Sequence, residues 1–486
     1  MGAGSRVSEQ AFIITPDLDW SVQRVVVAGA GVTGKAVAHA LARRGATVHV
    51  VDQGLTPGSA VKAEFETAGF IADDDELGAV VEASLMVVSP GWRPDAPVMK
   101  AAETLQVPIL GELDVAWILQ QQRGQGPAWL TLTGTNGKTT AVTMAESMLL
   151  AAGRRALAVG NVGRSIVEAI DAQEPYEVLA LELSSFQLHR SHLMRPFASA
   201  VLNIAPDHLD WHGDFAAYRA DKARILERTT HACIYRAEEP ITRQLIEQAD
   251  VEEGCRAIGT TLGIPALGEI GVVDGLILDR AFEDNRREEA TELAGVDDLV
   301  DQAAHTIANA LSATALVRST GVDPSAIRQG LRDWQPQPHR MTVVATIDEV
   351  TWVDDSKATN PHAAAASLAS FDDIVWIAGG LAKGAEFDEL VTRAASRLRA
   401  VIVLGTDRDQ VVAAVKRHAP DVPVIDVDDA ENGAVNLMQA AVEAARRHAV
   451  AGSTVLLAPA CASMDRFRDY HERGQLFADI VVRNQS

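Results

Sequence analysis

The stretch from Trp129 to Thr140, W-L-T-L-T-G-T-N-G-K-T-T, constrains the fold more than any other part of this chain. The apolar, β-branched run Leu130–Thr133 predicts a buried strand, and Ala141–Ala152 has a helical pattern that stops at Gly153. Between them lies a glycine turn followed by Lys138 and two threonines. Strand, glycine turn, Lys-Thr and helix in this order predict an α/β fold with a phosphate-binding loop.

The chemistry of phosphate binding calls for these residue types. Glycines let main-chain N–H groups close around phosphate oxygens, a lysine reaches the β- and γ-phosphates, and a threonine hydroxyl can hold Mg²⁺. The usual pattern has a further glycine five residues before Gly137, where this chain has Leu132, so the loop is a shortened G-x-x-G-K-T. The alternative is an ordinary glycine turn, which the Lys-Thr pair at the helix start disfavours.

Length and composition exclude several classes of protein. The 486 residues are enough for about three domains, and 22% charged with 47% hydrophobic residues indicates a globular chain. A net charge of −23 argues against broad binding to nucleic acid or anionic membranes, although a local anion site remains possible. Cys233, Cys255 and Cys461 have no paired spacing, which fits a reducing compartment and predicts neither a disulfide framework nor a zinc site. No signal peptide or long apolar run occurs, so we expect a cytoplasmic protein without membrane insertion.

A second nucleotide-type motif precedes the phosphate loop. A strand at Arg24–Ala28 leads into the glycine turn Gly29–Gly34 and a helix, and the next strand, Ala46–Val51, ends at Asp52. This G-x-G-x-x-G in a βαβ unit suggests NAD when taken alone, but it shows only that a helix N-terminus can receive a pyrophosphate. A purely structural turn is the alternative. A further strand, Leu85–Ser89, runs into a Pro-Gly loop on the same ligand side.

The segment after the phosphate loop supplies a candidate metal ligand. A glycine-rich linker at residues 123–127 precedes the phosphate loop, which starts a second α/β unit. Within this unit, the predicted strand Glu177–Leu183 carries Glu182 near its carboxyl end. A carboxylate there, downstream of a phosphate loop, is where a magnesium-directed group belongs. The alternative is an acidic residue at the N-terminus of the following helix.

Several further polar residues follow the strand Ala198–Ile204. The loop Ala205–His212 carries two histidines and two aspartates, but a single histidine in a loop is more often a surface or capping residue. The helix Phe215–Glu227 carries Lys222, which by itself is a solvated helix lysine. A β-hairpin is predicted at Gly268–Asp279.

A later helix and the last third of the chain complete the pattern. The helix Asp301–Arg318 places His305 and Asn309 on one face, for which an ordinary helix surface is the alternative. After a linker at residues 335–338, strands alternate with helices, which predicts a parallel, doubly wound sheet. Its strands are expected near 350–353, 374–377, 401–404, 424–425 and 455–457, and the loops 354–360, 379–384 and 459–465 are the expected ligand side.

Together these motifs resemble the Mur ligase family of ATP-dependent amide-forming enzymes, over essentially the whole chain. The motifs are G-T-N-G-K-T-T (134–140), E-L-S-S-F-Q-L (182–188), A-P-D-H-L-D (205–210), Y-R-A-D-K (218–222), H-R (339–340), D-D-S-K-A-T-N (354–360), G-G-x-x-K-G (379–384) and L-L-A-P-A-C-A-S (456–463). The resemblance implies three domains: a Rossmann-like UDP-binding domain (1–123), a central P-loop ATPase-type α/β domain (124–336) and a C-terminal, doubly wound Rossmann-like amino-acid domain (337–486).

The resemblance also implies substrates, with D-D-S-K-A-T-N and A-C-A-S favouring the family member that adds D-glutamate to UDP-N-acetylmuramoyl-L-alanine. This resemblance argues against NAD as the ligand of the first glycine turn. The expected UDP-substrate residues are Val32, Thr33, Asp52, Ser89, Gly91, Asn161 and His208. The expected ATP residues are Gly134, Thr135, Asn136, Gly137, Lys138, Thr139, Thr140, Asn309, Arg340 and Asp355. The expected D-glutamate residues are Thr359, Lys383, Ser463, Met464 and Tyr470; the family commonly has phenylalanine at the last position.

Catalysis is expected to depend on Lys138, Lys222, His208 and Glu182. The resemblance implies two Mg²⁺ sites that use Thr139, Glu182, His208 and Lys222, the last as a CO₂-derived carbamate. A carbamate suits such a site because it is an anionic oxygen ligand, whereas an ammonium repels Mg²⁺. A monomer is expected. Two rivals stay open: a ligase that adds another amino acid, or folate polyglutamylation, and a non-enzymatic NTP-driven switch or scaffold.

Overall fold

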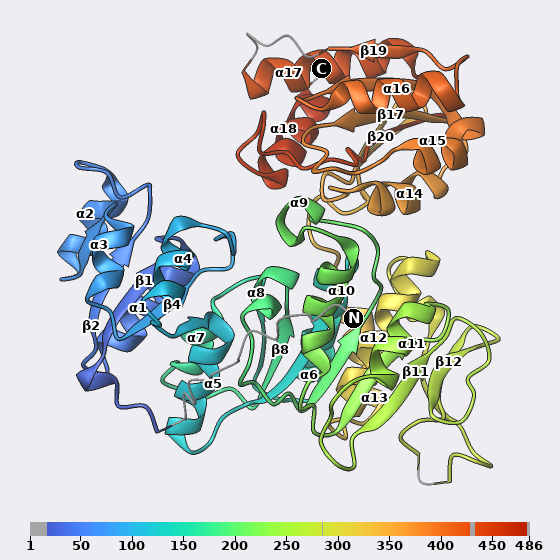
Figure 1. Cartoon of the computed structure of the whole chain (residues 1–486). Coiled ribbons are helices and arrows are strands. Elements are labelled where there is room, and N and C mark those ends of the chain that lie inside the picture. The colour runs from blue at the N-terminus through green and yellow to red at the C-terminus, as the bar shows by residue number, and fades with distance from the viewer. Residues whose placement is uncertain (1–16, 284, 428–432, 484–486) are drawn as a thin grey trace, which may run out of the picture.

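Three β-sheets follow one another along the chain in the computed structural model, which describes residues 17–283, 285–427 and 433–483 (Figure 1). Each sheet has its own helices and forms an α/β unit. The first unit is blue in Figure 1, the central unit runs from cyan through green to yellow, and the third is orange to red. The predicted α/β class with three such units is confirmed.

The first unit has a parallel sheet in the order β3-β2-β1-β4-β5. The strand order reverses between β1 and β4, so the loops after these strands form the expected ligand crevice. The three predicted strands are present, and the short β3 and β5 were missed. The strands are β1 (Arg24–Ala28), β2 (Thr47–Val51), β3 (Ile71–Asp73), β4 (Leu85–Val88) and β5 (Ile109–Gly111). The helices are α1 (Val32–Ala42), α2 (Ala60–Thr67), α3 (Glu76–Val81), α4 (Pro97–Thr104) and α5 (Glu112–Arg123).

The central unit has a nine-stranded sheet in the order β14-β13-β12-β11-β10-β9-β6-β8-β7. Its strands are parallel from β7 to β12, and an antiparallel edge, which includes the predicted hairpin, follows. The strands are β6 (Ala128–Thr133), β7 (Ala156–Gly160), β8 (Val178–Glu182), β9 (Ala198–Val201), β10 (Ala232–Arg236), β11 (Arg256–Thr260), β12 (Glu269–Val273), β13 (Leu276–Asp279) and β14 (Thr291–Gly295). The helices are α6 (Lys138–Ala151), α7 (Ile166–Ile170), α8 (Ser185–His189), α9 (Leu209–His212), α10 (Phe215–Ala223), α11 (Pro240–Glu247), α12 (Ala304–Arg318) and α13 (Pro324–Asp333).

The third unit differs from the prediction at one edge of its sheet, which has the order β15-β16-β20-β17-β18-β19. The five predicted strands are parallel, but β15 pairs with β16 in the antiparallel sense through a short turn that follows Ile347. The strands are β15 (Thr342–Ile347), β16 (Val350–Asp354), β17 (Ile374–Gly379), β18 (Leu398–Leu404), β19 (Val424–Asp426) and β20 (Thr454–Leu457). The helices are α14 (Pro361–Ala369), α15 (Asp388–Ala394), α16 (Arg408–His418), α17 (Ala434–His448) and α18 (Tyr470–Arg483).

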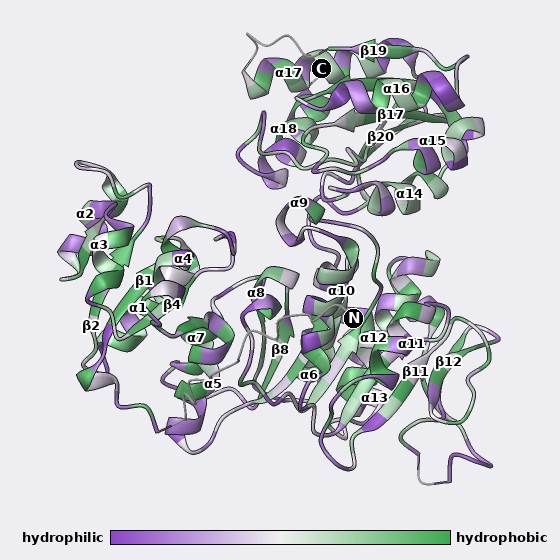
Figure 2. Cartoon of the chain, in the orientation of Figure 1, coloured by the Kyte–Doolittle hydropathy of each residue, from purple (hydrophilic) through white to green (hydrophobic). Residues whose placement is uncertain are grey.

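Buried hydrophobic side chains form clusters between each sheet and its helices. Figure 2 accordingly colours much of β1 and β4 as hydrophobic. Leu130 and Leu132 of β6 are fully buried against α6 and α12, so the strand that leads into the phosphate loop is held by the core. The three cysteines are free, yet the Sγ atoms of Cys233 and Cys255 lie 3.8 Å apart, a proximity that their sequence spacing did not reveal. Among the described residues, every helix falls short of the length or apolar character of a membrane span.

The helix that follows the phosphate loop packs very closely against α13 at Gly330. A Cβ atom at this position would lie 2.3 Å from Cα of Met148 in α6 and 2.6 Å from its main-chain N, and these backbone atoms cannot turn aside. The Ser147 hydroxyl also donates to the Gly330 carbonyl at 2.7 Å. The contact of α6 with α13 therefore requires glycine.

We predict that Gly330→Ala destabilises the central unit by about 1–3 kcal/mol, because the added methyl group forces two packed helices apart. Alanine alone would favour a helix by about 1 kcal/mol over glycine, so the packing effect has the opposite sign. Calorimetry should show a lower unfolding midpoint. Gly433→Ala is the control, since a Cβ there meets open space; equal midpoints for the two variants would contradict the prediction.

Candidate active site

The phosphate loop connects β6 to α6 and has the geometry that its sequence predicts. Gly137, the residue before α6, has φ of +81°, a left-handed conformation that favours glycine. A Cβ at Gly137 would also lie 2.3 Å from Oδ1 of Asn309. The amide of Asn309, which is 4% exposed, thus lies directly against the loop. The pair His305 and Asn309 was open to interpretation as helix surface, and the structure places Asn309 at the loop instead.

Two lysines donate hydrogen bonds to one carbonyl of this loop. Lys138 Nζ lies 2.8 Å from the Gly134 oxygen and 2.9 Å from that of Thr135. Lys222 Nζ also lies 2.8 Å from the Gly134 oxygen and 3.1 Å from Oγ1 of Thr133. Burial lowers the pKa of Lys138 and holds the pKa of Lys222 well below its ordinary value, and the charge of Lys138 lowers the latter further. Lys222 is 2% exposed, so it is not the solvated lysine that its helix alone suggested.

Glu182, at the end of β8, offers an unused carboxylate oxygen near these lysines. Its Oε1 accepts a hydrogen bond of 2.9 Å from Nδ2 of Asn161, whereas Oε2 is buried without a partner. The charge of Glu182 acts on the pKa of both Lys138 and Lys222. A buried, unpaired carboxylate oxygen beside a phosphate loop fits a magnesium ligand, because Mg²⁺ binds one or two carboxylates together with phosphate and water.

His208 stands at the start of α9 with a left-handed φ of 52°, and its ring lies 4.7 Å from that of Phe186. Burial lowers the pKa of His208 to about 4; Asp207 opposes this shift, and the charges of Lys383, Lys138 and Lys222 add to it. His208 is therefore neutral near pH 7 and keeps a nitrogen lone pair free to bind a metal. Among the residues that the structure describes, no three His, Cys, Asp or Glu side chains gather as a metal cluster, so a metal here needs phosphate, water or another oxygen ligand as well.

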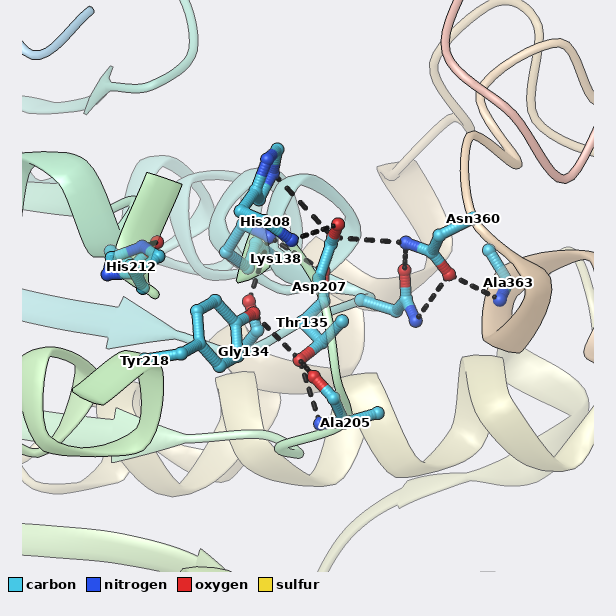
Figure 3. Close-up of polar contacts among 12 residues, drawn as sticks. Gly134, Thr135, Lys138, Ala205, Asp207, His208, His212, Tyr218, Asn360 and Ala363 are labelled. Atoms are coloured by element: carbon cyan, nitrogen blue, oxygen red, sulfur yellow. Dashed lines mark hydrogen bonds and ion pairs between the residues drawn. The ribbon is translucent and has the colours of Figure 1, made fainter. Parts of the chain in front are cut away.

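The loop from Ala205 to His212 is where the three units meet. From the first unit, Arg93 Nη2 donates to the Asp210 carbonyl at 3.0 Å. From the third unit, Asn360 Nδ2 donates to Oδ1 of Asn136 at 3.1 Å and to Oδ2 of Asp207 at 3.4 Å (Figure 3). The phosphate loop and the third unit are thus in direct contact through side-chain amides.

The first unit holds a cavity of about 750 Å³ at its switch point. Its lining includes the predicted Val32, Thr33, Asp52, Ser89 and Gly91. The Asp52 carboxylate accepts a hydrogen bond of 3.0 Å from the main-chain N of Ala30, and the Ser89 hydroxyl is buried without a partner. Five of the predicted UDP residues therefore share one cavity. The other two lie in the central unit, where Asn161 contacts Glu182 and His208 precedes α9.

The third unit presents its strand-end loops as predicted. Lys357 Nζ lies 3.7 Å above the Tyr470 ring, and burial lowers the pKa of Lys357 to about 8. Ser463 is buried and Met464 exposed, and the backbone of Lys383 has a left-handed φ of 52°. Thr359 lies in the loop that ends at Asn360, next to the central unit.

Arg340 and Asp355 lie at the start of the third unit, where Arg340 precedes β15 and Asp355 follows β16. The Ser367 hydroxyl and the main-chain N of Met341 donate to Asp355, and burial raises the pKa of Asp355 to about 6. The charge of Arg340 acts on Asp355 in its own unit and on Lys138 in the central unit. The predicted ATP residues of the two units therefore lie close enough to influence one another.

Two supporting residues carried no signal in the sequence. Arg473 in α18 is fully buried and donates to Ser356 Oγ at 3.0 Å, to Ser356 O at 2.8 Å and to Cys461 O at 3.2 Å, which joins the loops after β16 and β20. Asp221, the neighbour of Lys222, accepts hydrogen bonds of 2.9 Å from Nδ1 of both His189 and His212. Their partners are 9 to 117 residues away in the sequence, so no local pattern could reveal them.

Comparisons with known proteins give the class. Residues 23–111 match the Mur ligase MurD-like N-terminal domain, residues 132–270 the Mur ligase middle domain and residues 339–461 the Mur ligase glutamate ligase domain. The chain belongs to the Mur ligase family, whose members are ATP-dependent ligases that form amide bonds.

Individual relatives show which members of the Mur ligase family this chain is similar to in sequence and in fold. The UDP-N-acetylmuramoylalanine–D-glutamate ligase of Streptomyces avermitilis is 52% identical over 466 residues, which are 95% of this chain and 98% of the relative. The enzyme of the same name from Mycolicibacterium smegmatis is 42% identical over 487 residues, covering 94% and 96%. Among solved structures, the UDP-N-acetylmuramate-alanine ligase MurC of Thermotoga maritima has a TM-score of 0.57 at 16% identity and covers 95% of this chain and 100% of its own. The MurF ligase of the same organism, in complex with ADP, has a TM-score of 0.54 at 16% identity and covers 96% of this chain and 100% of its own. Both structures have the same fold as this chain.

We predict that Asp221→Asn destabilises the central unit by about 2 kcal/mol near pH 7. Burial alone would raise the Asp221 pKa, but the hydrogen bonds from His189 and His212 outweigh it and lower the pKa from 3.8 to about 2. A lowered acid pKa stabilises the fold above the unfolded value, and this stabilisation is lost as the pH falls through the folded value. The difference in unfolding midpoint between the wild type and the variant should therefore shrink from about pH 4 to pH 2. A difference that stays constant with pH would refute this; Asp421→Asn, at an exposed site, serves as control.

Proposed function

We propose that this chain joins D-glutamate to UDP-N-acetylmuramoyl-L-alanine, with conversion of ATP to ADP and phosphate, in the synthesis of peptidoglycan precursors. The observation that carries the proposal is the pair of buried lysines on the Gly134 carbonyl, next to the unpaired oxygen of Glu182. Such a cluster suits a polyphosphate, because the lysines can neutralise its charge and the free oxygen of Glu182 can bind the accompanying Mg²⁺. The relatives that cover nearly the whole chain are named for this reaction.

The chemistry requires activation because a carboxylate does not release oxide. The L-alanyl carboxylate oxygen attacks the γ-phosphorus of ATP, the bond to ADP breaks, and an acyl phosphate results. The D-glutamate amine then attacks the acyl carbon, a tetrahedral intermediate forms, the amine loses a proton, and phosphate leaves. The chain contributes mainly by positioning the substrates and neutralising charge.

We assign the nucleotide to Gly134, Thr135, Asn136, Gly137, Lys138, Thr139, Thr140, Asn309, Arg340 and Asp355. Glu182, His208 and Thr139 are the groups that would hold Mg²⁺, which when bound neutralises the charge of the phosphates. The neutral His208 and the unpaired Oε2 of Glu182 support this assignment.

Lys222 is the residue that we assign as a carbamate. The reaction needs a neutral amine, whose lone pair forms a bond to the carbon of CO₂ while a proton leaves to solvent. Burial and the charge of Lys138 favour the neutral amine here. The resulting anion would lie beside two positive groups, Lys138 and a metal, which would stabilise it.

The substrates are assigned to separate units. We place UDP in the cavity of the first unit, with Asn161 and His208 near the muramoyl end, and D-glutamate at Thr359, Lys383, Ser463, Met464 and Tyr470. We place the domain boundaries at 123/124 and 336/337, and residues 335–338 would act as a hinge. We also expect a cytoplasmic monomer. A ligase for another amino acid would differ at Lys383, Ser463 and Tyr470; an NTP-driven switch would not need the amine.

We predict phosphate release from ATP only when UDP-N-acetylmuramoyl-L-alanine and D-glutamate are both present. The measurement compares D-glutamate, L-glutamate, meso-diaminopimelate and no amine. Release with another amine would keep the family and change the substrate. Release that is indifferent to every amine would favour the NTP-driven switch and contradict the proposal.

We predict that Lys222→Ala loses nearly all ligase activity and regains part of it when a short carboxylic acid is added, because the acid can supply the missing anionic oxygen. Lys138→Ala is the matched comparison: it should be equally inactive, with the fold intact, and should not respond to the acid. Activity is measured as phosphate release, and folding by circular dichroism. A folded Lys222→Ala variant without rescue would argue against the carbamate.

A further inference from the structure

Arg236 is a buried cation that the assignments above leave unused. It is the last residue of β10, and its Nη2 donates to Oδ1 of Asn309 at 2.5 Å. Its Nε is buried without a partner. In the described ranges of the chain, no carboxylate lies within ion-pair distance of Arg236. A buried charge without a bonded counter-ion is costly, so its place in the site calls for a reason.

The position of Arg236 links it to the phosphate loop through Asn309. The strand order places β10 two strands from β6, and α12 packs over β9, β10 and β11. The Asn309 amide occupies the space that a side chain at Gly137 would need. On the same face of α12, burial lowers the pKa of His305, Asp301 opposes this shift, and the charge of Arg236 makes a smaller contribution that also lowers the pKa. Arg236 therefore contacts Asn309, and Asn309 in turn contacts the phosphate loop at Gly137.

The contact fixes the orientation of the Asn309 amide. A guanidinium group only donates hydrogen bonds, so Arg236 can bind the oxygen of the amide but not its nitrogen. One lone pair of Oδ1 is used in this way, and the two N–H donors of Nδ2 point away from Arg236. No acceptor within the described residues bonds to Nδ2. Acceptor atoms on a purine ring or a phosphate would match these donors.

We propose that Arg236 is a positioning residue of the nucleotide site: it holds the Asn309 amide so that Nδ2 donates to an acceptor atom of bound ATP or ADP. This inference rests on the use of ATP in the proposed function. It predicts that loss of Arg236 weakens nucleotide affinity and leaves the affinity for D-glutamate unchanged. It also predicts that Arg236 acts only through Asn309.

The test measures ADP binding by titration calorimetry, with Mg²⁺, for the wild type, Arg236→Met, Arg236→Lys, Asn309→Ala and the double variant Arg236→Met/Asn309→Ala. Methionine keeps most of the side-chain volume without a donor. We expect Arg236→Met to bind ADP about tenfold more weakly, as for the loss of one well-placed hydrogen bond. Arg236→Lys should lie between, because its ammonium can still donate to Oδ1. The double variant should bind no more weakly than Asn309→Ala alone.

The controls distinguish a role of Arg236 in nucleotide binding from a general effect of losing an arginine and from failure of the proposed function. Arg243→Met, an exposed arginine paired with Glu247 in α11, should bind ADP as the wild type does. In turnover, Arg236→Met should raise the KM for ATP and leave the KM for D-glutamate unchanged. Wild-type affinity in Arg236→Met, or additive losses in the double variant, would overturn the inference. If Arg236→Met does not fold, equal affinities of Arg236→Lys and the wild type overturn it. A wild type that does not bind ADP would instead refute the proposed function.

Discussion

The carbonyl oxygen of Gly134 accepts hydrogen bonds from two buried lysines, and this crowding sets the character of the whole site. Two ammonium groups on one oxygen repel each other in a region of low dielectric, which favours loss of a proton or arrival of an anion. Triphosphate supplies anionic oxygens, and a carbamate on Lys222 would turn one of the two cations into an anion. The loop is therefore arranged around charges that its ligands bring.

The charges around Lys138 come from two of the three units. The charges that act on Lys138 come from Glu182 and Asp207 of the central unit and from Arg340 of the third. The third unit contacts the central unit through polar groups such as Asn136 with Asn360, whereas helices α1 and α5 of the first unit pack against α7 in a shared apolar core. Polar contacts of this kind exchange readily with water and cost little to break. The contact of Asn136 with Asn360 therefore contributes little to holding the third unit against the phosphate loop.

Local patterns predicted much of this structure, and long-range contacts account for the rest. Strand β1 and the phosphate loop were predictable because a buried strand, a glycine turn and a helix start each leave a signal within a few residues. Strands β3 and β5 have only three residues each, too short for a recognisable alternation. The bonds of Arg473 to Ser356 and of Asp221 to His189 join distant segments. Such partners are set by the packing of the sheets, which no sequence window contains.

Three of the buried side-chain atoms without partners among the described residues lie where ligands are assigned, while others, such as Trp352 Nε1, lie elsewhere in the fold. Ser89 Oγ lies at the cavity of the first unit, Glu182 Oε2 beside the phosphate loop, and Arg236 Nε behind Asn309. Each such atom lowers stability by roughly 1–3 kcal/mol while it stays unpaired. A ligand that completes these hydrogen bonds recovers this free energy on binding, so the binding energy is partly stored in the fold.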